Sequence, residues 1–395
     1  MVSRIAGEGA DRFEKTGDYY LTQEEKRDLE TLNRMVDSLV VVLNVGAQID
    51  VEEILSFDKV KALLSLVQPG MEGGNALADV LTGAVNPSGK LTDTWAVRYS
   101  DFPNAATFSH NNGNIETEKY EEGIYVGYRY FDSFGIEPVF PFGYGLSYTQ
   151  FEVKAKAVTT DHASVTVSVA VTNTGSRAGK EVAQIYASCP QQGMAKEYRR
   201  LCGFAKTPLL NPGECREMKI TFPAKELASF DQEASAWTME KGLYGIWVGN
   251  SSRNLTLAGA LSVEADAVIE PVKHICPLKQ ELTEMERPEA EAKAWEAAWH
   301  QQLKENGLEC IPLKPQPVKA DRIPENELDE KARSITEQLT DDQLIAMVIG
   351  EISKGQENAL GSAGIMVPGA AGETSGALEK EFDVPGIPMA DGPAG

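Results

Sequence analysis

The chain has 395 residues, of which 42% are hydrophobic and 24% charged, so it can bury a substantial core and is long enough for about two to three domains. Its net charge of -22 disfavours nucleic acid and anionic membrane surfaces as partners. The longest apolar run, in SLVVVLNVG, is far shorter than the roughly 20 residues of a membrane span. No secretory signal pattern follows Met1.

The cysteines favour a reducing compartment. Their number is odd and none has CxxC spacing, which does not suit a disulfide framework. The five are Cys189, Cys202, Cys215, Cys276 and Cys310. The four histidines share no ligand spacing with them, so we expect no metal site and no cofactor. We expect a cytoplasmic protein, and the oligomeric state is left open.

Residues 1–146 have the pattern of an α/β domain. DSLVVVLNVGAQID contains a continuous apolar run, which is typical of a strand buried on both faces, whereas VKALLSLV suits either a second strand or a buried helix. PGMEGGNALADVLTG predicts a loop and a short helix that ends at Gly83. Its apolar face would consist of Ala76, Leu77, Val80 and Leu81. An aromatic, Gly- and Pro-dense segment, YEEGIYVGYRYFDSFGIEPVFPFGYGLSYTQF, predicts a closely packed irregular connection.

Residues 147–264 change to strict alternation. In SVTVSVAVTNTG, alternate valines predict a half-buried antiparallel strand closed by a turn. EVAQIYAS, CREMKITF and GLYGIWVGNSS are further strand candidates, the last with Tyr244, Ile246 and Val248 in alternation. Several short strands separated by turns predict an immunoglobulin-like β-sandwich, and the lack of a Cys-Trp-Cys pattern favours a fibronectin III-like version.

Residues 265–325 form a connector rich in Glu, Lys and Pro. One helix is predicted there, starting near Pro288 and ending near Gly307. Its stripe of Ala292, Trp295, Trp299 and Leu303 could pack onto a neighbouring domain or form a sugar platform, and packing is favoured. Residues 326–395 begin with two helices that meet at Thr340, whose spacing to Gln343 predicts a capping box, and end in a Gly/Pro/Ala-rich stretch.

Three stretches together resemble glycoside hydrolase family 3, in particular its bacterial β-glucosidases. IAGEGADR resembles the acid/base loop of the family's α/β-sandwich domain. PGMEGGNALADVLTGAVNPSGKLTDTW and the aromatic segment after it resemble the family's approach to its fibronectin III-like domain, the most specific of the three matches. VPGAAGET with IPMADGPAG resembles the opening of the family's (β/α)8 barrel.

The resemblance implies a multidomain fold of α/β and all-β parts. It comprises part of an α/β sandwich over 1–146, a fibronectin III-like β-sandwich over 147–264, the connector, and the first elements of a (β/α)8 barrel over 326–395. The commoner family order places the barrel first, so this chain resembles the minority with exchanged order. Only seven residues precede Glu8, and the sequence ends at DGPAG with nearly all of the barrel absent, so we expect an internal fragment of a larger enzyme.

By this resemblance the chain belongs to a retaining glycosidase that removes terminal β-linked glucose or xylose from glycosides or oligosaccharides. Such enzymes use two carboxyl groups, a nucleophile and an acid that later acts as base. The resemblance assigns the acid/base role to Glu8, between Gly7 and Gly9, and a sugar-hydroxyl contact to Asp391. We expect Asp11 and Arg12 to form a local ion pair that shapes the loop.

The family nucleophile is an aspartate that tryptophan usually follows. The five tryptophans, Trp95, Trp237, Trp247, Trp295 and Trp299, follow Thr, Ala, Ile, Ala and Ala. No Asp-Trp pair exists in the sequence, so we expect the nucleophile to be absent and the chain to be inactive alone.

Two other classes of function are alternatives to a glycosidase. In a non-catalytic carbohydrate-binding or scaffold protein built on the β-sandwich, Tyr186, Tyr244 and Trp247 would be the candidate sugar contacts, although their alternating positions favour core packing. A nucleotide-binding α/β protein is disfavoured, because no GxGxxG follows the VVVLNVG strand and no GxxxxGK[ST] occurs in the sequence.

Overall fold

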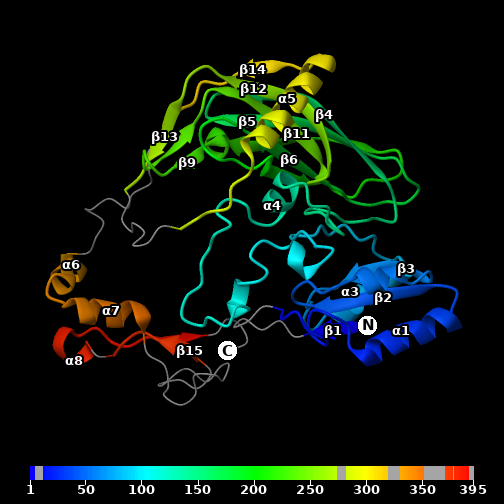
Figure 1. Cartoon of the computed structure of the whole chain (residues 1–395), viewed down its shortest axis with the longest axis horizontal. Helices are drawn as coiled ribbons and strands as arrows, with labels where there is room; N and C mark the ends of the chain where they lie inside the picture. Colours follow the sequence, from blue (N-terminus) through cyan, green and yellow to red (C-terminus); the bar gives the residue numbers. More distant parts are fainter. Residues whose placement is uncertain (5–11, 274–281, 319–329, 351–369, 377, 391–395) are drawn as a thin grey trace. The chain divides into compact units, whose positions relative to one another are not determined.

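The computed structural model describes residues 1–4, 12–273, 282–318, 330–350, 370–376 and 378–390 (Figure 1). The chain divides into two compact units, Met1–Lys319 and Ala320–Gly395, which are described separately. The first unit contains an α/β part followed by a β-sandwich.

The α/β part is built on a three-stranded parallel sheet. Its order is β1 (Val2–Arg4), β2 (Leu39–Val45) and β3 (Val60–Ser65), so β2 is the central strand. The apolar run of β2 is buried from Val41 to Leu43, whereas Val40 is exposed, so burial on both faces is confirmed only for the middle of the strand. VKALLSLV forms a strand and not a helix. Helices α1 (Gln23–Met35) and α2 (Glu52–Ser56) contribute buried Leu29 and Ile54 to the core of this sheet.

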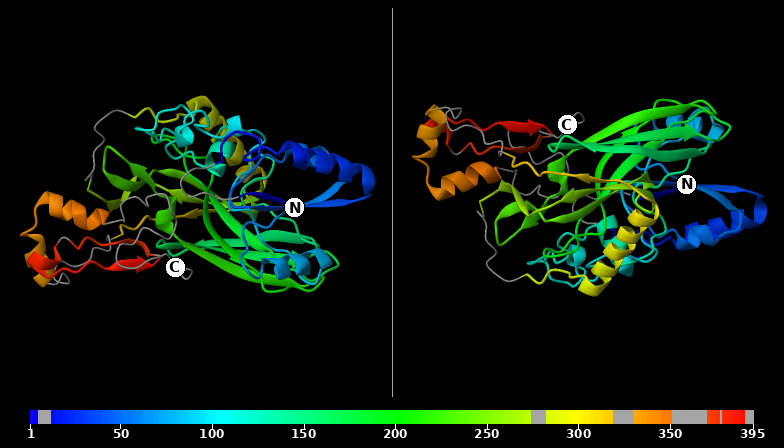
Figure 2. Two further views of the ribbon diagram at one scale, coloured as in Figure 1. Left: turned by 90° about the horizontal axis from the view of Figure 1, so that it is seen from below. Right: turned by 90° about the horizontal axis from the view of Figure 1, so that it is seen from above.

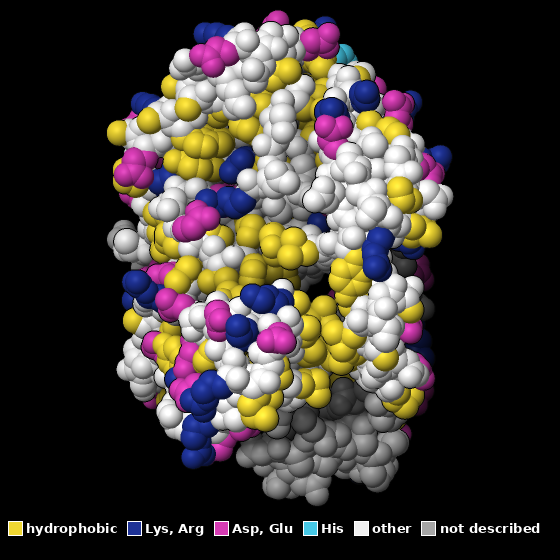
Figure 3. All heavy atoms as spheres, turned by 90° about the vertical axis from the view of Figure 1, so that its right-hand side faces the viewer, with side chains coloured by type: hydrophobic (Ala, Val, Ile, Leu, Met, Phe, Trp, Pro, Cys, Tyr) yellow, Lys and Arg dark blue, Asp and Glu magenta, His cyan; other side chains and the backbone are white. Residues whose placement is uncertain are grey.

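The predicted short helix is α3 (Gly73–Thr82), and Gly83 ends it in a left-handed conformation with φ 78°. Its apolar residues do not form a buried face: Leu77 and Val80 are half-buried, whereas Ala76 and Leu81 are exposed. Further exposed apolar side chains of this region are Val40, Val67, Met71 and Val85. The space-filling view shows hydrophobic side chains between charged ones over one side of the molecule (Figure 3).

A long irregular connection joins the sheet to the β-sandwich. It includes two 3-10 turns, η1 (Tyr99–Asp101) and η2 (Phe108–His110), and helix α4 (Tyr128–Ser133). Edge-to-face aromatic contacts run through it, from Tyr99 to Phe102 and from Phe102 to Phe131, with ring centroids about 6 Å apart. Within the predicted segment, Tyr125 and Phe131 are buried, whereas Tyr120, Leu146 and Tyr148 are exposed. Close packing is therefore confirmed for its middle and not for its two ends.

The β-sandwich consists of three antiparallel or mixed sheets around one core. One sheet has the order β4 (Phe151–Thr160), β5 (Ser164–Asn173), β8 (Cys215–Pro223). The second has the order β14 (Cys310–Pro312), β12 (Asn254–Val263), β11 (Gly242–Ser251), β6 (Val182–Ser188), β7 (Arg200–Lys206). The third has the order β13 (Ala267–Pro271), β10 (Ala236–Met239), β9 (Ser229–Asp231), and a 3-10 turn, η3 (Ala224–Leu227), precedes it. The alternating valines of β5 are fully buried in the shared core, as the period of two predicted.

The connector packs onto this sandwich. Helix α5 (Glu289–Glu305) covers the outer face of the five-stranded sheet, where Trp299 and Leu303 are buried with Tyr186 and Trp247 (Figures 1 and 2). Trp295 stacks on Tyr198 at 4.2 Å with the rings nearly parallel. The packing interpretation of the tryptophan stripe is therefore confirmed.

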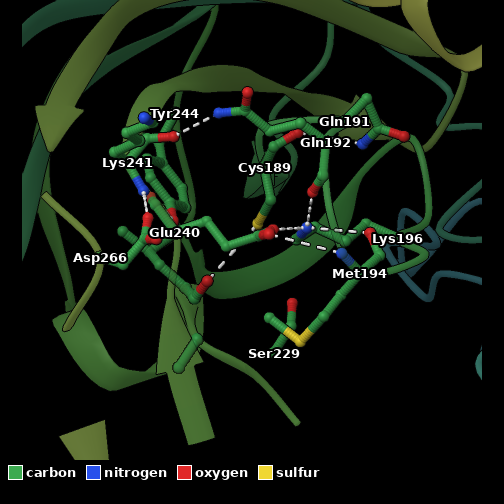
Figure 4. A network of polar contacts seen from close by, with 12 residues as sticks. Cys189, Gln191, Gln192, Met194, Lys196, Ser229, Glu240, Lys241, Tyr244 and Asp266 are labelled. Carbon is green, nitrogen blue, oxygen red and sulfur yellow. Dashed lines mark hydrogen bonds and ion pairs between the residues drawn. The ribbon is translucent and has the colours of Figure 1, made fainter. Parts of the chain in front are cut away.

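A buried charge pair fixes the loop between β6 and β7. Lys196 is almost completely buried, pairs with the Glu240 carboxylate, and donates to the backbone oxygens of Gln192 and Met194 at 3.1 and 3.0 Å (Figure 4). Tyr244 Oη donates to the backbone oxygen of Glu240 at 2.7 Å. Because the buried Lys196 ammonium is paired with a carboxylate and with two backbone oxygens, it fixes the conformation of the loop around it.

Polar contacts also join the sandwich to the α/β part. Lys90 Nζ lies 2.7 Å from Glu181 Oε1, with both side chains nearly buried. Arg253, in the turn between β11 and β12, pairs with Asp132 of α4 and donates to the backbone oxygen of Ile136 at 2.9 Å. Since a broken buried pair leaves an uncompensated charge, these contacts disfavour separation of the two parts.

The second unit is described by itself. It contains α6 (Glu330–Thr336), α7 (Asp341–Ile349), β15 (Ala370–Glu373), α8 (Glu379–Phe382) and β16 (Pro388–Ala390), with β15 and β16 paired antiparallel. The predicted capping box is confirmed, since Thr340 accepts from the Gln343 N–H and the Gln343 side chain accepts in return. Among the described parts of the chain, no helix is long and apolar enough to span a membrane.

Candidate active site

The two residues expected to act on substrate, Glu8 and Asp391, lie outside the described residues. Asp11 lies outside them as well. The structure does describe the chain on both sides of the GEGADR segment, from β1 up to Arg4 and again from Arg12. Arg4 and Arg12 are the described residues that flank the segment containing Glu8, and we call these two residues its stem.

Arg4 anchors the first side of the stem. Its guanidinium donates to both carboxylate oxygens of Glu25, at 2.8 and 2.7 Å, and its Nε donates to the backbone oxygen of Asp18 at 3.1 Å. The Arg4 side chain is only 7% exposed. The hydrogen bond to Glu25 raises the pKa of Arg4, and in return it lowers the pKa of the Glu25 carboxyl. A two-point pair of this kind fixes direction as well as distance.

Glu25 also caps the start of helix α1. It is the third residue of α1 and closes a capping box with Thr22, accepting from the Thr22 N–H at 2.8 Å. The start of α1 and the end of β1 are therefore fixed by the same carboxylate.

Arg12 anchors the other side of the stem. Its Nη1 donates to Asp18 Oδ1 at 3.0 Å, and the Phe13 N–H donates to Asp18 Oδ2 at 3.0 Å. Tyr99 Oη donates to the Arg12 backbone oxygen at 3.4 Å. Asp18 thus contacts both sides of the stem, through its backbone with Arg4 and through its carboxylate with Arg12.

Sequence reasoning missed Arg4, Asp18 and Glu25. For Glu25 a signal existed, since Thr22 followed three residues later by glutamate is a capping-box pattern. Nothing in the spacing of Arg4 and Asp18 predicts their contact, because the loop between them brings them together. The expected Asp11–Arg12 pair is untested; among the described residues, Asp18 is an acidic partner of Arg12.

The stem lies at the edge of the sheet where ligands usually bind. The three strands are parallel, so the segments after β1, β2 and β3 leave from the same edge. In open α/β sheets, ligand sites form at the carboxyl ends of the strands. Asn44, at the end of β2, and Gln48 after it each have a buried side-chain oxygen with no hydrogen-bond partner among the described residues.

The aromatic candidates for a sugar-binding sandwich are core residues. Tyr186 and Tyr244 are at most 1% exposed and Trp247 is 7% exposed. Their polar atoms are also engaged within the protein, for example Trp247 Nε1 with Ser188 Oγ at 2.8 Å. They are not available to a ligand. Within the described ranges no group of three or more His, Cys, Asp or Glu could hold a metal ion, and Cys189, Cys202, Cys215 and Cys310 are free thiols.

Comparison with known families assigns both parts of the first unit. Residues 1–128 match the glycosyl hydrolase family 3 C-terminal domain, and residues 181–252 match the fibronectin type III-like domain. The chain belongs to glycoside hydrolase family 3. The α/β part is thus the family's C-terminal domain, and the sandwich is its fibronectin III-like domain.

Curated relatives of this family 3 chain are named β-glucosidases. A β-glucosidase of Ruminococcus albus is 40% identical over 279 residues, which cover 69% of this chain and 29% of the relative. β-Glucosidase A of Butyrivibrio fibrisolvens is 32% identical over 427 residues, covering 96% of this chain and 49% of the relative. The chain therefore spans about half, or less, of the length of these relatives.

Solved structures agree with the fold. A β-glucosidase from Paenibacillus barengoltzii matches with a TM-score of 0.66 and 40% identity, over 69% of this chain and 31% of that one. β-Glucosidase 3B from Thermotoga neapolitana, in complex with glucose, matches with a TM-score of 0.63 and 43% identity, over 67% of this chain and 37% of that one.

The Butyrivibrio alignment also bears on the second unit. It leaves only 4% of this chain uncovered, whereas Ala320–Gly395 is 76 of 395 residues, or 19%. Most of the second unit therefore has a counterpart in that relative, after the counterpart of the sandwich.

Proposed function

We propose that this chain supplies the acid/base half of a retaining β-glucosidase, which releases terminal β-linked glucose or xylose from glycosides. The observation that carries the proposal is the two-arginine stem on Asp18, at the carboxyl edge of a parallel sheet in the family's C-terminal domain. It fixes both ends of the short segment that contains Glu8. The glucosidic substrate class rests on the names of the relatives.

The chemistry assigned to Glu8 is proton transfer. Its carboxyl would protonate the departing glycosidic oxygen while the nucleophile bonds to the anomeric carbon. The resulting carboxylate would then take a proton from the water that releases the sugar. This cycle needs a carboxyl that is protonated at the working pH, which burial against a partner domain supplies by raising its pKa. Gly7 and Gly9 would permit the backbone conformations that such a projecting loop requires.

The remaining assignments are part of the same proposal. Asp391 would accept hydrogen bonds from two sugar hydroxyls, and residues 326–395 would be the first elements of a (β/α)8 barrel. The domain boundaries at 146/147 and 325/326 and the exchanged domain order belong to it too. The boundary expected at 264/265 does not end the sandwich, because β13 and β14 lie beyond it and pair with sandwich strands. Free thiols at the described cysteines support a cytoplasmic location.

The nucleophile would come from outside this sequence, which has no Asp-Trp pair. We expect the purified 395-residue chain not to turn over an aryl β-glucoside at an enzymatic rate. The matched control is Glu8→Gln, which should give the same background rate. Turnover by the chain that Glu8→Gln abolishes would contradict the assignment, because both carboxyl groups would then be present.

A further inference from the structure

The outer face of the small third sheet presents aromatic side chains to solvent. In this sheet Ala236, Met239 and Ile269 point inward and are at least 98% buried. Phe230 of β9 and Trp237 of β10, by contrast, are each 43% exposed. Single exposed apolar residues are ordinary, but two adjacent exposed aromatic rings on one face form a patch that calls for an explanation.

These aromatic residues belong to a straight row across the sheet. Trp237 is directly paired with Phe230 on one side and with Glu270 of β13 on the other. Directly opposed residues of antiparallel strands project from the same face with Cβ atoms about 4.5–5.5 Å apart. The two rings meet edge to face at a centroid distance of 5.5 Å. The row therefore presents ring, ring and carboxylate over roughly 10 Å, twice the strand spacing.

We propose that the row of Phe230, Trp237 and Glu270 binds a neutral oligosaccharide, at a site separate from the Glu8 chemistry. The apolar C–H face of a pyranose packs on an aromatic ring, while hydroxyl groups at its edge donate to a carboxylate, which accepts from two at once. Among the described residues no cation pairs with Glu270, so its oxygens are available to such donors. The half-exposed Trp237 indole supplies the aromatic face, and the neighbouring Glu270 carboxylate supplies the acceptor for sugar hydroxyl groups.

Charge disfavours anionic occupants, and the small area of the row disfavours a protein partner that would contact the row alone. The carboxylate in the row and the net charge of -22 repel anionic ligands and anionic lipid surfaces. A stable protein partner needs about 800 Å² on each side. Two half-exposed rings, each of about 150–250 Å² when whole, supply only a small part of that area. A ligand the size of a disaccharide fits the row.

The test is calorimetric titration of the full chain with cellohexaose as the probe. Wild type should bind at about millimolar affinity, as a shallow two-ring site allows. Trp237→Ala should weaken binding about tenfold, Glu270→Gln should weaken it several-fold, and Trp237→Phe should retain part of it. The matched control is Tyr120→Ala, which removes an exposed ring, 68% exposed, that is outside the row. This control should bind as wild type does.

Three results would overturn the oligosaccharide site. No binding by wild type, or equal binding by wild type and Trp237→Ala, would overturn the proposal. So would a change of molecular mass in solution caused by Trp237→Ala, since the row would then be a contact between copies of the chain. Glu8→Gln should bind like wild type, so failure of this site and failure of the acid/base assignment are distinguished. Circular dichroism of each variant checks that the exposed substitutions leave the fold unchanged.

Discussion

At the scale of single residues, Asp18 and Glu25 matter more than their positions in the sequence indicate. Asp18 contacts both arginines of the stem, and Glu25 holds Arg4 while it caps α1. Charge-assisted hydrogen bonds are short, directional and about twice as strong as neutral ones. The segment that contains Glu8 therefore begins and ends at fixed points, which is what a proton-transfer group requires of its supports.

Removing the Glu25 charge should destabilise the first unit. Glu25→Gln leaves the nearly buried Arg4 guanidinium without its anionic partner, and we expect the free energy of unfolding in urea to fall by about 1–3 kcal/mol. The matched control is Glu24→Gln, which breaks the ion pair with Arg27. Both of those side chains are at least 70% exposed, so the loss should stay below about 0.5 kcal/mol. Equal effects of the two changes would contradict this account.

The same pair gives stability a defined pH dependence. The folded-state pKa of Glu25 is lowered from 4.5, so its contribution is fully present above that value and is lost as pH falls through the lower folded pKa. The difference in unfolding free energy between wild type and Glu25→Gln should therefore be constant near neutral pH and shrink below about pH 4.5. Urea titrations at a series of pH values measure it. A difference that persists unchanged at the acid end would show that charge is not its cause.

At the scale of elements, α5 is part of the sandwich and not a free linker. Trp299 is 2% exposed against the five-stranded sheet, and a Cβ added at Gly245 would lie 3.1 Å from its ring. The side chain thus fills a site shaped by the absence of a side chain on β11. Strand β14, which follows the helix, pairs in parallel with β12 and completes the attachment.

Truncating this tryptophan should release the helix. Trp299→Ala removes a buried aromatic side chain, for which the expected loss of stability is about 3–5 kcal/mol. Amide hydrogen exchange should accelerate throughout α5 and β14 and much less in β5. Lys293→Ala, on the exposed side of the same helix, is the control and should leave exchange unchanged. Uniform acceleration across the sandwich would indicate that α5 is not a separate unit of stability.

Sequence patterns predicted elements well where one physical signal dominated. The alternating valines of β5, the capping box at Thr340 and the tryptophan stripe of α5 all reflect local periodicity or local hydrogen bonding. The helix α3 shows the limit, since its apolar residues predicted a face that the structure leaves largely exposed. The contact of Arg4 with Asp18 depends on a loop that returns to the sheet, and no local pattern encodes that path.

At the scale of the whole molecule, the first unit is a domain pair held by buried charges. Lys90 with Glu181 and Arg253 with Asp132 join the α/β part to the sandwich. Burial raises the pKa of Asp132 in spite of Arg253, which indicates that desolvation of this carboxylate opposes the attraction. Removal of one partner of such a pair leaves an uncompensated charge, which is more destabilising than loss of the whole pair.

Breaking one of these pairs should therefore weaken the connection between the two parts. Arg253→Met removes the closest cation from the nearly buried Asp132 carboxylate. We expect unfolding to begin at a lower urea concentration and to separate into two transitions. Arg216→Met, on the exposed part of β8, is the control. A single transition with the wild-type midpoint in both variants would contradict the role of the pair.

If Glu8 donates the proton to the leaving group, the loss of kcat/KM in Glu8→Gln must grow with the basicity of the leaving group. The measurement is kcat/KM of wild type and Glu8→Gln for a series of β-glucosides, with the barrel domain present in the same or a second polypeptide. We expect Glu8→Gln to lower kcat/KM about 10²–10⁴-fold for alkyl glucosides, which need protonation of the leaving group, and only slightly for dinitrophenyl glucoside, which does not. A loss of equal size across the series would contradict this role of Glu8.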